Sequence, residues 1–393
     1  MDRLRASIDR LADEAVEITA QLVRIASDGP ANDERAVVTA IRDAADRLGL
    51  PAGEIVAAEA AHPNLLIRVP GAAPGRRLIL TSHTDTKPPG DDADPWSGTI
   101  HHGRLHGLGA ADAKGSVASM LVAAAALRDA GLPLAGELLL VFSADEESDG
   151  TRGLAQVAST GALGADAAIV GEPSGVEVAF DTLPLLARGF AGFTLRASGR
   201  PLHSGLAGWS RQGADPIASI ARAIVGLPAL ADLPPPSRLT FTSLGGGLAD
   251  GILPATAWVR GEVRTLPGQT RDDVVAAIRD GIQRLHERHG DREAPIEVDV
   301  DPVDWPASAI DEDEPIVTAL AAAIEQVTGR RAEPGTFPGA TEAHVLAGLG
   351  VPTVPAFGPG LLESAHVPGE SIAIDDVRTA VAIYARAAAA FLA

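Results

Sequence analysis

Four apolar, strand-like runs in the first part of the chain alternate with helical segments, and this alternation limits the possible fold more than any other feature. The runs are Leu65–Val69, Leu78–Thr81, Leu138–Phe142 and Ala167–Val170. An alanine-rich segment after Gly115, which predicts a helix, separates the second run from the third. Strands that alternate with helices in this way are typical of an α/β fold whose core strands are mostly parallel.

The middle of the chain has a different order of predicted strands and helices. Four further strand-like runs occur there: Gly192–Ala197, Leu239–Ser243, Ala257–Val263 and Ile296–Val300. Helical patterns near 215–225 and 271–288 separate them, which gives a β-α-β-β-α-β order. That order predicts an inserted α+β domain of the ferredoxin-like type. We therefore expect a discontinuous catalytic domain, 1–178 and 302–393, and an inserted lid or dimerisation domain, 179–301.

After the insert, predicted helices and strands alternate again as in the first part of the chain. A helical pattern covers Pro315–Thr328, a strand-like run covers Val351–Phe357, and the chain closes with an alanine-rich helical segment. The segments Ala179–Ala187 and Asp301–Ala309 are expected to be hinges between the two domains.

Histidine and carboxylate side chains, the types that can bind metal ions, follow several of the predicted strands or open the alanine-rich helix. They are His83, Asp85, Asp112, Glu146, Glu147, Glu172 and His366. Each sequence fragment has an ordinary alternative: the His83–Asp85 pair could be a surface or core pair, Asp112 could cap a helix, Glu172 could be a turn residue, and the acidic run at 145–150 could be a solvated turn. Because ligands of open α/β sheets collect at the carboxyl ends of strands, we expect the set to converge at one edge.

The chain contains no cysteine, so a transition-metal site must be built from histidine, aspartate and glutamate. Imidazole and carboxylate ligands without thiolate suit zinc, cobalt or manganese. A carboxylate that bridges two ions about 3.5 Å apart is usual in co-catalytic pairs. One further carboxylate must stay unbound to the metal to act as general base, and adjacent glutamates can divide these two tasks.

These motifs resemble the dinuclear zinc amidohydrolases and exopeptidases, which include acetylornithine deacetylase, succinyl-diaminopimelate desuccinylase, aminoacylase and glutamate-releasing carboxypeptidases. The resemblance covers essentially the whole chain. The motifs are SHTD (82–85), GLGAADAKG (107–115), ADEESDG (144–150), GEPSG (171–175), GRPLHSG (199–205) and ESAHVPGE (363–370). The resemblance implies an aminopeptidase-like catalytic domain and two divalent ions per subunit, zinc first and cobalt or manganese as alternatives.

The resemblance also assigns the metal ligands. Asp112 matches the carboxylate that bridges the two ions. His83 and Glu172 complete one metal position, and Glu147 and His366 complete the other.

Four further residues receive roles from the resemblance. Glu146 matches the general base, and Asp85 matches the partner that orients His83. His203 matches a histidine that reaches the active site of the partner subunit and donates to the developing oxyanion, which implies a homodimer. Arg264 matches a position that could hold a substrate carboxylate. A surface turn is the alternative for His203, and an ordinary strand-surface arginine is the alternative for Arg264.

The sequence departs from the family pattern at two positions. Leu108 replaces the arginine that usually precedes the bridging aspartate, and Glu342 stands where an aspartate is common. Neither position is a predicted ligand. A possible second metal cluster, His101, His102 and His106, is rejected because it lies around a predicted hairpin tip without nearby carboxylates.

Composition and pattern exclude other classes of protein. A net charge of −20 argues against a nucleic-acid partner. The amphipathic N-terminal segment lacks a signal-peptide apolar block, and the most apolar run, 117–127, is shorter than the roughly 20 residues that span a bilayer. We therefore expect a cytoplasmic protein without membrane contact.

Two activities remain open: cleavage of an N-acyl amino acid, and exopeptidase or dipeptidase action on a short peptide. A serine hydrolase would need a G-x-S-x-G elbow, which the sequence lacks. A binding protein without activity would be expected to have lost a ligand or the general base.

Overall fold

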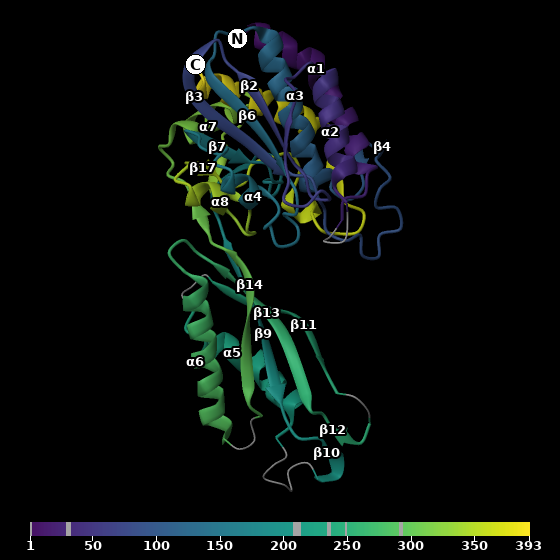
Figure 1. The fold of residues 1–393 in the computed structure, drawn as a ribbon, viewed down its shortest axis with the longest axis vertical. Coiled ribbons are helices and arrows are strands. Elements are labelled where there is room, and N and C mark those ends of the chain that lie inside the picture. Colours follow the sequence, from purple (N-terminus) through teal and green to yellow (C-terminus); the bar gives the residue numbers. More distant parts are fainter. Residues whose placement is uncertain (1, 29–32, 207–213, 234–236, 248–249, 291–293) are drawn as a thin grey trace. The chain divides into compact units, whose positions relative to one another are not determined.

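The computed structural model describes residues 2–28, 33–206, 214–233, 237–247, 250–290 and 294–393 (Figure 1). The chain forms two compact units. The first comprises Met1–Ala187, Ala309–Phe337 and Thr341–Ala393, and the second comprises Arg188–Ser308 with Pro338–Ala340. The change from one unit to the other thus falls several residues later, at both ends, than the boundaries expected from the sequence.

A six-stranded sheet forms the centre of the first unit. Its strands lie in the order β1 (Glu54–Val56), β2 (Asn64–Pro70), β6 (Ala135–Ser143), β3 (Ala73–His83), β7 (Ala167–Val170) and β17 (Thr353–Val354). The last four strands of this order are parallel, whereas β2 pairs antiparallel with β6 and with β1. The prediction of an α/β fold with mostly parallel core strands is confirmed, in a sheet that is mixed at one edge.

Helices cover both faces of this sheet because successive strand residues point to opposite sides. Leu78 and Leu80 of β3 belong to the larger apolar cluster, and Ile79 between them belongs to a second cluster on the other face. The larger cluster includes α1 (Asp2–Val23), α2 (Arg35–Arg47), α3 (Gly115–Ala130), α7 (Pro315–Thr328) and α9 (Ile374–Phe391). The second includes α4 (Leu154–Ser159) and α8 (Ala343–Gly348).

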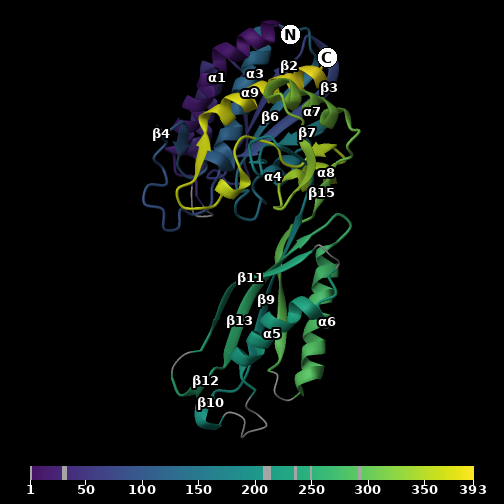
Figure 2. The same ribbon diagram turned by 180° about the vertical axis from the view of Figure 1, so that it is seen from behind.

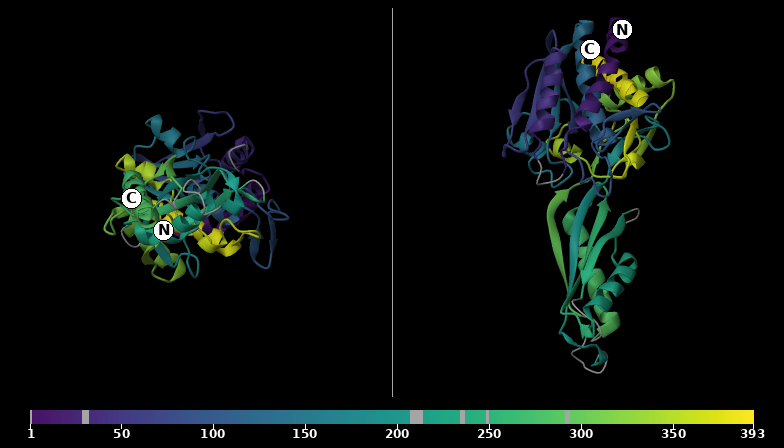
Figure 3. Two further views of the ribbon diagram at one scale, coloured as in Figure 1. Left: turned by 90° about the horizontal axis from the view of Figure 1, so that it is seen from below. Right: turned by 90° about the vertical axis from the view of Figure 1, so that its right-hand side faces the viewer.

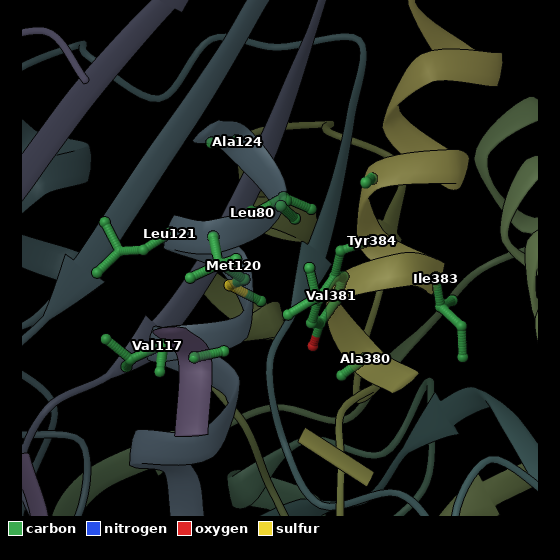
Figure 4. Close-up of a cluster of buried hydrophobic side chains, with 14 of the residues drawn as sticks. Leu80, Val117, Met120, Leu121, Ala124, Ala380, Val381, Ile383 and Tyr384 are labelled. Atoms are coloured by element: carbon green, nitrogen blue, oxygen red, sulfur yellow. The ribbon is translucent and has the colours of Figure 1, made fainter. Parts of the chain in front are cut away.

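Helix α3 is buried along nearly its whole length and packs against α1 and α9 (Figure 2). Its Met120 meets Leu80 of the sheet and Val381 of α9 in the core (Figure 4). With the turn before it, α3 forms a 21-residue segment, Ala110–Ala130, long and apolar enough to cross a membrane. The prediction that the most apolar segment is too short to span a bilayer is therefore wrong as to length. The apolar window is entirely buried in the unit, however, so packing accounts for its composition.

Two small sheets complete the first unit. One contains β15 (Ser308–Ala309), β8 (Thr182–Ala187) and β16 (Glu333–Phe337); the other contains β18 (Ser371–Ala373), β5 (Arg104–His106) and β4 (Thr99–His101). The sheet that contains β8 contradicts the prediction that Ala179–Ala187 is a hinge. Leu183 and Ala187 are buried and the strand pairs in parallel with β16, so much of this segment is a strand rather than a linker.

The second unit is an antiparallel sheet with two helices. Its elements follow in the order β9 (Gly189–Ser198), α5 (Pro216–Leu230), β11 (Arg238–Gly246), β13 (Thr256–Thr265), α6 (Arg271–His289) and β14 (Ile296–Trp305). The sheet order is β11-β13-β9-β14, and both helices share one apolar cluster with β9 and β13. The strands and helices of this unit are drawn in teal and green in Figure 3 (right). A separate strand pair consists of β10 (Leu202–His203) and β12 (Ile252–Leu253). The role of this unit as a lid or dimerisation domain stays a prediction.

Candidate metal centre

The parallel strands of the first unit bring polar side chains to one edge of the central sheet. His83 is the last residue of β3 and pairs with Ser143, the last residue of β6. Glu146 and Glu147 lie in the loop that follows β6, and Glu172 lies just beyond β7. These side chains gather because neighbouring parallel strands end at the same edge.

Two ligand candidates come from outside the strands. Asp112 lies in the turn η1 (Ala110–Lys114) that leads into α3. His366 follows the short helix η4 (Leu362–Ser364), with a backbone φ of 59°. A positive φ is uncommon for residues other than glycine, and such residues cluster at functional sites.

Short distances connect the five predicted metal ligands in a chain from Glu172 to Glu147. Asp112 stands between the two histidines: Oδ1 lies 3.1 Å from Nε2 of His83, and Oδ2 lies 3.1 Å from Nε2 of His366. Glu172 Oε1 is 3.8 Å from His83 Nε2, and Glu147 Oε1 is 2.8 Å from His366 Nε2. Candidate ligand atoms of His83, Asp112 and Glu147 all lie within 4.8 Å of one another. The arrangement therefore has two sides with Asp112 between them.

The centre concentrates negative charge in a buried place. Burial raises the pKa of the Glu172 carboxyl well above its usual value, and nearby Asp112 raises it further. Burial alone would lower the pKa of His366, but its hydrogen bonds with Asp112 and Glu147 outweigh this and raise it to about 10. The raised pKa values mean that the side chains of this cluster bind protons tightly, as expected where negative charge is concentrated.

This donor set fits divalent cations. Two imidazoles and three carboxylates without thiolate are ligands that suit zinc, cobalt and manganese. Binding of such ions requires deprotonated ligands and therefore releases the protons that the histidines otherwise hold.

Asp85 contacts more residues of the centre than His83, the one that it was predicted to orient. The carbonyl oxygen of Asp85 lies 3.0 Å from Nδ1 of His83, and its carboxylate Oδ1 lies 3.4 Å from the same nitrogen. The same carboxylate accepts the backbone N–H groups of Glu146 at 3.1 Å and Glu147 at 2.9 Å. One side chain therefore contacts a histidine and fixes the backbone of both glutamates.

The structure adds three residues that sequence reasoning did not assign to the site. Glu370 Oε1 accepts the backbone N–H groups of Ala111 and Asp112 at 2.8 and 3.0 Å. Glu342 accepts from the hydroxyl of Ser143 and from the backbone N–H of Leu154, the latter at 2.7 Å.

Lys87 is the third, and its Nζ lies 3.0 Å from Oε2 of Glu147. Glu370 carried a sequence signal as the last residue of ESAHVPGE, and Glu342 was noted only as a departure from the family pattern. The partners of Glu342 and Lys87 are distant in sequence, and no local pattern shows them.

Several polar side chains form hydrogen bonds with the loop that carries the two glutamates. Glu34 Oε1 lies 2.8 Å from Nδ1 of His62 and accepts the backbone N–H of Asp145 at 3.2 Å. Arg152 pairs with Asp145 and reaches Nε2 of His62. His62 thus lies inside a hydrogen-bonded network that fixes this loop.

The two remaining predicted site residues belong to the second unit. His203 lies in β10, is exposed, and accepts the backbone N–H of Gly205 at 3.1 Å. Arg264 in β13 lies 3.1 Å from Glu262 Oε1 and over the ring of Phe190. Neither lies in the unit that carries the candidate ligands, and their predicted roles are proposals.

The rings of three histidines of the β4–β5 hairpin lie against one another. The rings of His101 and His106 are parallel, with centroids 3.8 Å apart, and His102 meets His101 edge-on. Among the described residues, only His83, Asp112 and Glu147 form a group with the spacing of a metal site.

Known proteins resemble this chain over most of its length. The sequence model of peptidase family M20/M25/M40 matches residues 79–390. A succinyl-diaminopimelate desuccinylase of Bradyrhizobium sp. is 30% identical over 396 residues, covering 94% of this chain and 97% of the relative. A second desuccinylase, from Rhodospirillum centenum, is 30% identical and covers 79% of this chain and 80% of its own.

Solved structures share the fold. An M20 family metallo-carboxypeptidase from Sulfolobus solfataricus has a TM-score of 0.75 at 18% identity, covering 96% of this chain and 99% of the other. A dinuclear metal binding peptidase from Bacillus subtilis has a TM-score of 0.69 at 18% identity, covering 99% of both. The chain belongs to peptidase family M20/M25/M40 and is a hydrolase that acts on amide or peptide bonds.

Proposed function

We propose that this protein removes the acyl group from an N-acyl amino acid, using two divalent cations and a glutamate general base. The observation that carries the proposal is the position of Asp112, whose two carboxylate oxygens face different histidines. His83 and Glu172 would hold one ion, Glu147 and His366 the other, and Asp112 both. Zinc is the ion that we propose first, because imidazole and carboxylate suit it and thiolate is absent.

Two divalent cations, when bound, polarise the scissile carbonyl and lower the pKa of an attacking water. Glu146 accepts the proton from that water and then donates it to the nitrogen of the leaving amine. Burial and the neighbouring Glu147 raise the pKa of Glu146, although His83 opposes this, so the residue binds a proton readily. Asp85 keeps Glu146 in place through the backbone N–H that it accepts.

The substrate class rests on the desuccinylase relatives, which cover most of this chain. A desuccinylase removes an acyl group from an amino group, and we propose the same reaction type here. In the second unit, Arg264 is our candidate for holding the substrate carboxylate, and His203 is our candidate donor to the oxyanion across a homodimer. The peptidases among the solved structures share less than 25% identity and support the fold alone.

Metal removal followed by a substrate panel tests this proposal. Protein treated with a chelator should lose hydrolysis, and added zinc, cobalt or manganese should restore it. The panel contains N-succinyl and N-acetyl amino acids beside dipeptides of the same amino acids. Faster cleavage of the N-acyl compounds supports the deacylase, whereas faster cleavage of the dipeptides would replace it by an exopeptidase. Full activity in metal-free protein would contradict the two-ion centre itself.

A further inference from the structure

Lys87 brings a positive charge into the centre from the carboxyl end of β3. Its Nζ donates to the backbone carbonyl of Glu147 at 2.6 Å and lies 3.0 Å from Oε2 of the same residue. The other oxygen of that carboxylate, Oε1, lies 2.8 Å from His366. Glu147 is therefore shared between an ammonium group and a candidate metal ligand.

The two sides of the centre differ in their access to solvent. On one side, the side chains of His83 and Glu172 are 1% and 6% exposed. On the other side, the His366 side chain is 46% exposed and that of Lys87 is 41% exposed, while Glu147 between them is 4% exposed. The Glu147–His366 side is thus the open one.

We propose that Lys87 makes the two cation positions unequal, so that the ion on the Glu147–His366 side binds more weakly and exchanges first. The inference rests on the dinuclear centre of the proposed function. It assigns Lys87 as a positioning residue, which acts on the metal through Glu147 and makes occupancy of one position depend on the free metal concentration.

Two physical effects act in the same direction. The ammonium occupies an acceptor of Glu147 that a cation would otherwise use, so binding must displace or share that contact. In addition, zinc–carboxylate bonds are about 2 Å long, which leaves a divalent cation on either oxygen of Glu147 within about 7 Å of Nζ. Even with the dielectric constant of water, repulsion at this distance corresponds to about tenfold in affinity.

Matched variants of Lys87 separate charge from shape. Lys87→Met keeps a similar length without the charge, Lys87→Gln is a second uncharged variant, and Lys87→Arg keeps the charge. Because the side chain is partly exposed, all three should fold, which circular dichroism and the melting temperature check.

The experiment is a calorimetric titration of the metal-free full-length protein with zinc at low ionic strength. Wild type should bind two ions with unequal Kd values, and His366→Ala should lose the weaker one. In Lys87→Met and Lys87→Gln the weaker Kd should tighten about tenfold while the stronger one stays unchanged. Lys87→Arg should resemble wild type.

Two results would overturn the inference. Uncharged variants that bind two ions with an unchanged or weaker second Kd would show that Lys87 does not oppose the cation, and would leave the dinuclear centre intact. Wild-type protein that binds fewer than two ions would contradict the dinuclear centre and this inference together.

Discussion

The two neighbouring glutamates of the loop after β6 have different surroundings. Glu147 faces His366 and Lys87. Burial acts to raise its pKa, but the hydrogen bond with His366 and the positive charges of Lys87 and His366 together lower it. The pKa of Glu146 is instead raised well above its usual value, by burial first. Two adjacent carboxyls whose pKa values are pushed apart suit two tasks, one as ligand and one as proton acceptor.

Substitution of these glutamates should therefore have different effects. Glu146→Gln should retain two metal ions and lose about 10²–10⁴-fold in kcat, because only the proton transfer is removed. Glu147→Gln should lower the metal content on the His366 side. Elemental analysis of the dialysed proteins, beside kcat, checks both. Metal loss in the Glu146 variant with full metal in the Glu147 variant would reverse the two roles.

Glu342 gives a prediction on pH. Burial raises the pKa of this carboxyl to about 7, against the hydrogen bonds from Ser143 and Leu154. Because the folded chain binds this proton more tightly than the unfolded chain, the stabilisation is fully present below the unfolded pKa and is lost as pH rises through 7. A difference of one pKa unit between the folded and unfolded chains corresponds to about 1.4 kcal/mol, so the total loss is on the order of 3 kcal/mol.

Denaturant unfolding of the metal-free protein at pH 5 and pH 8 measures this decrease in the free energy of unfolding. Glu342→Gln cannot titrate, so its unfolding free energy should change less between the two pH values than that of wild type. Equal pH dependence in the two proteins would show that Glu342 ionises normally.

At the scale of elements, the loop between β6 and α4 is held closed at its two ends. Glu342 contacts Ser143 at the end of β6 and Leu154 at the start of α4. Gly153 completes the closure, because a Cβ atom there would lie 2.2 Å from the backbone oxygen of Ala144. The loop that presents the two glutamates thus depends on a close backbone approach.

Gly153→Ala should force this loop open. We expect a loss of about 1–3 kcal/mol in unfolding free energy, as for other overpacked sites, together with reduced metal content. Gly164→Ala is the matched control, since a Cβ there meets nothing within 4 Å, and should change stability by no more than about 0.5 kcal/mol. Differential scanning calorimetry compares the two. Similar melting temperatures would mean that the loop adapts.

At the scale of the whole molecule, our proposal assigns catalytic roles to residues of two different compact units. Glu146 lies in the first unit and His203 in the second. The proposal that His203 serves the partner subunit predicts complementation in a two-fold dimer. Glu146→Ala and His203→Ala proteins should each be nearly inactive. Mixed and reassembled, about half of the dimers are heterodimers with one intact site, so activity should recover to roughly a quarter of wild type.

Size-exclusion chromatography and differential tagging establish whether heterodimers form. Heterodimers without recovered activity would place the function of His203 within its own chain or outside catalysis.

Much of this architecture could be predicted because it depends on local pattern. Apolar runs such as Ala167–Val170 and the helix Pro315–Thr328 appear in the structure at the predicted residues, since burial on one or both faces produces a period in the sequence. The convergence of His83 and Glu172 followed from a general rule on strand ends. Ala179–Ala187 was misjudged because a short parallel strand is defined by its partner, β16, more than 140 residues later in the chain.

The sequence by itself determined which residues could serve as ligands, base and core, because chemical type and periodicity are properties of the chain alone. Tertiary structure decided how these residues act on one another. It placed Lys87 against Glu147 and let Asp85 accept the backbone N–H groups of Glu146 and Glu147. It also placed Glu342 where it accepts the backbone N–H of Leu154, beyond the loop that carries the two glutamates. Such contacts join segments distant in the chain, and their distance and burial, which set charge and affinity, exist only once the chain has folded.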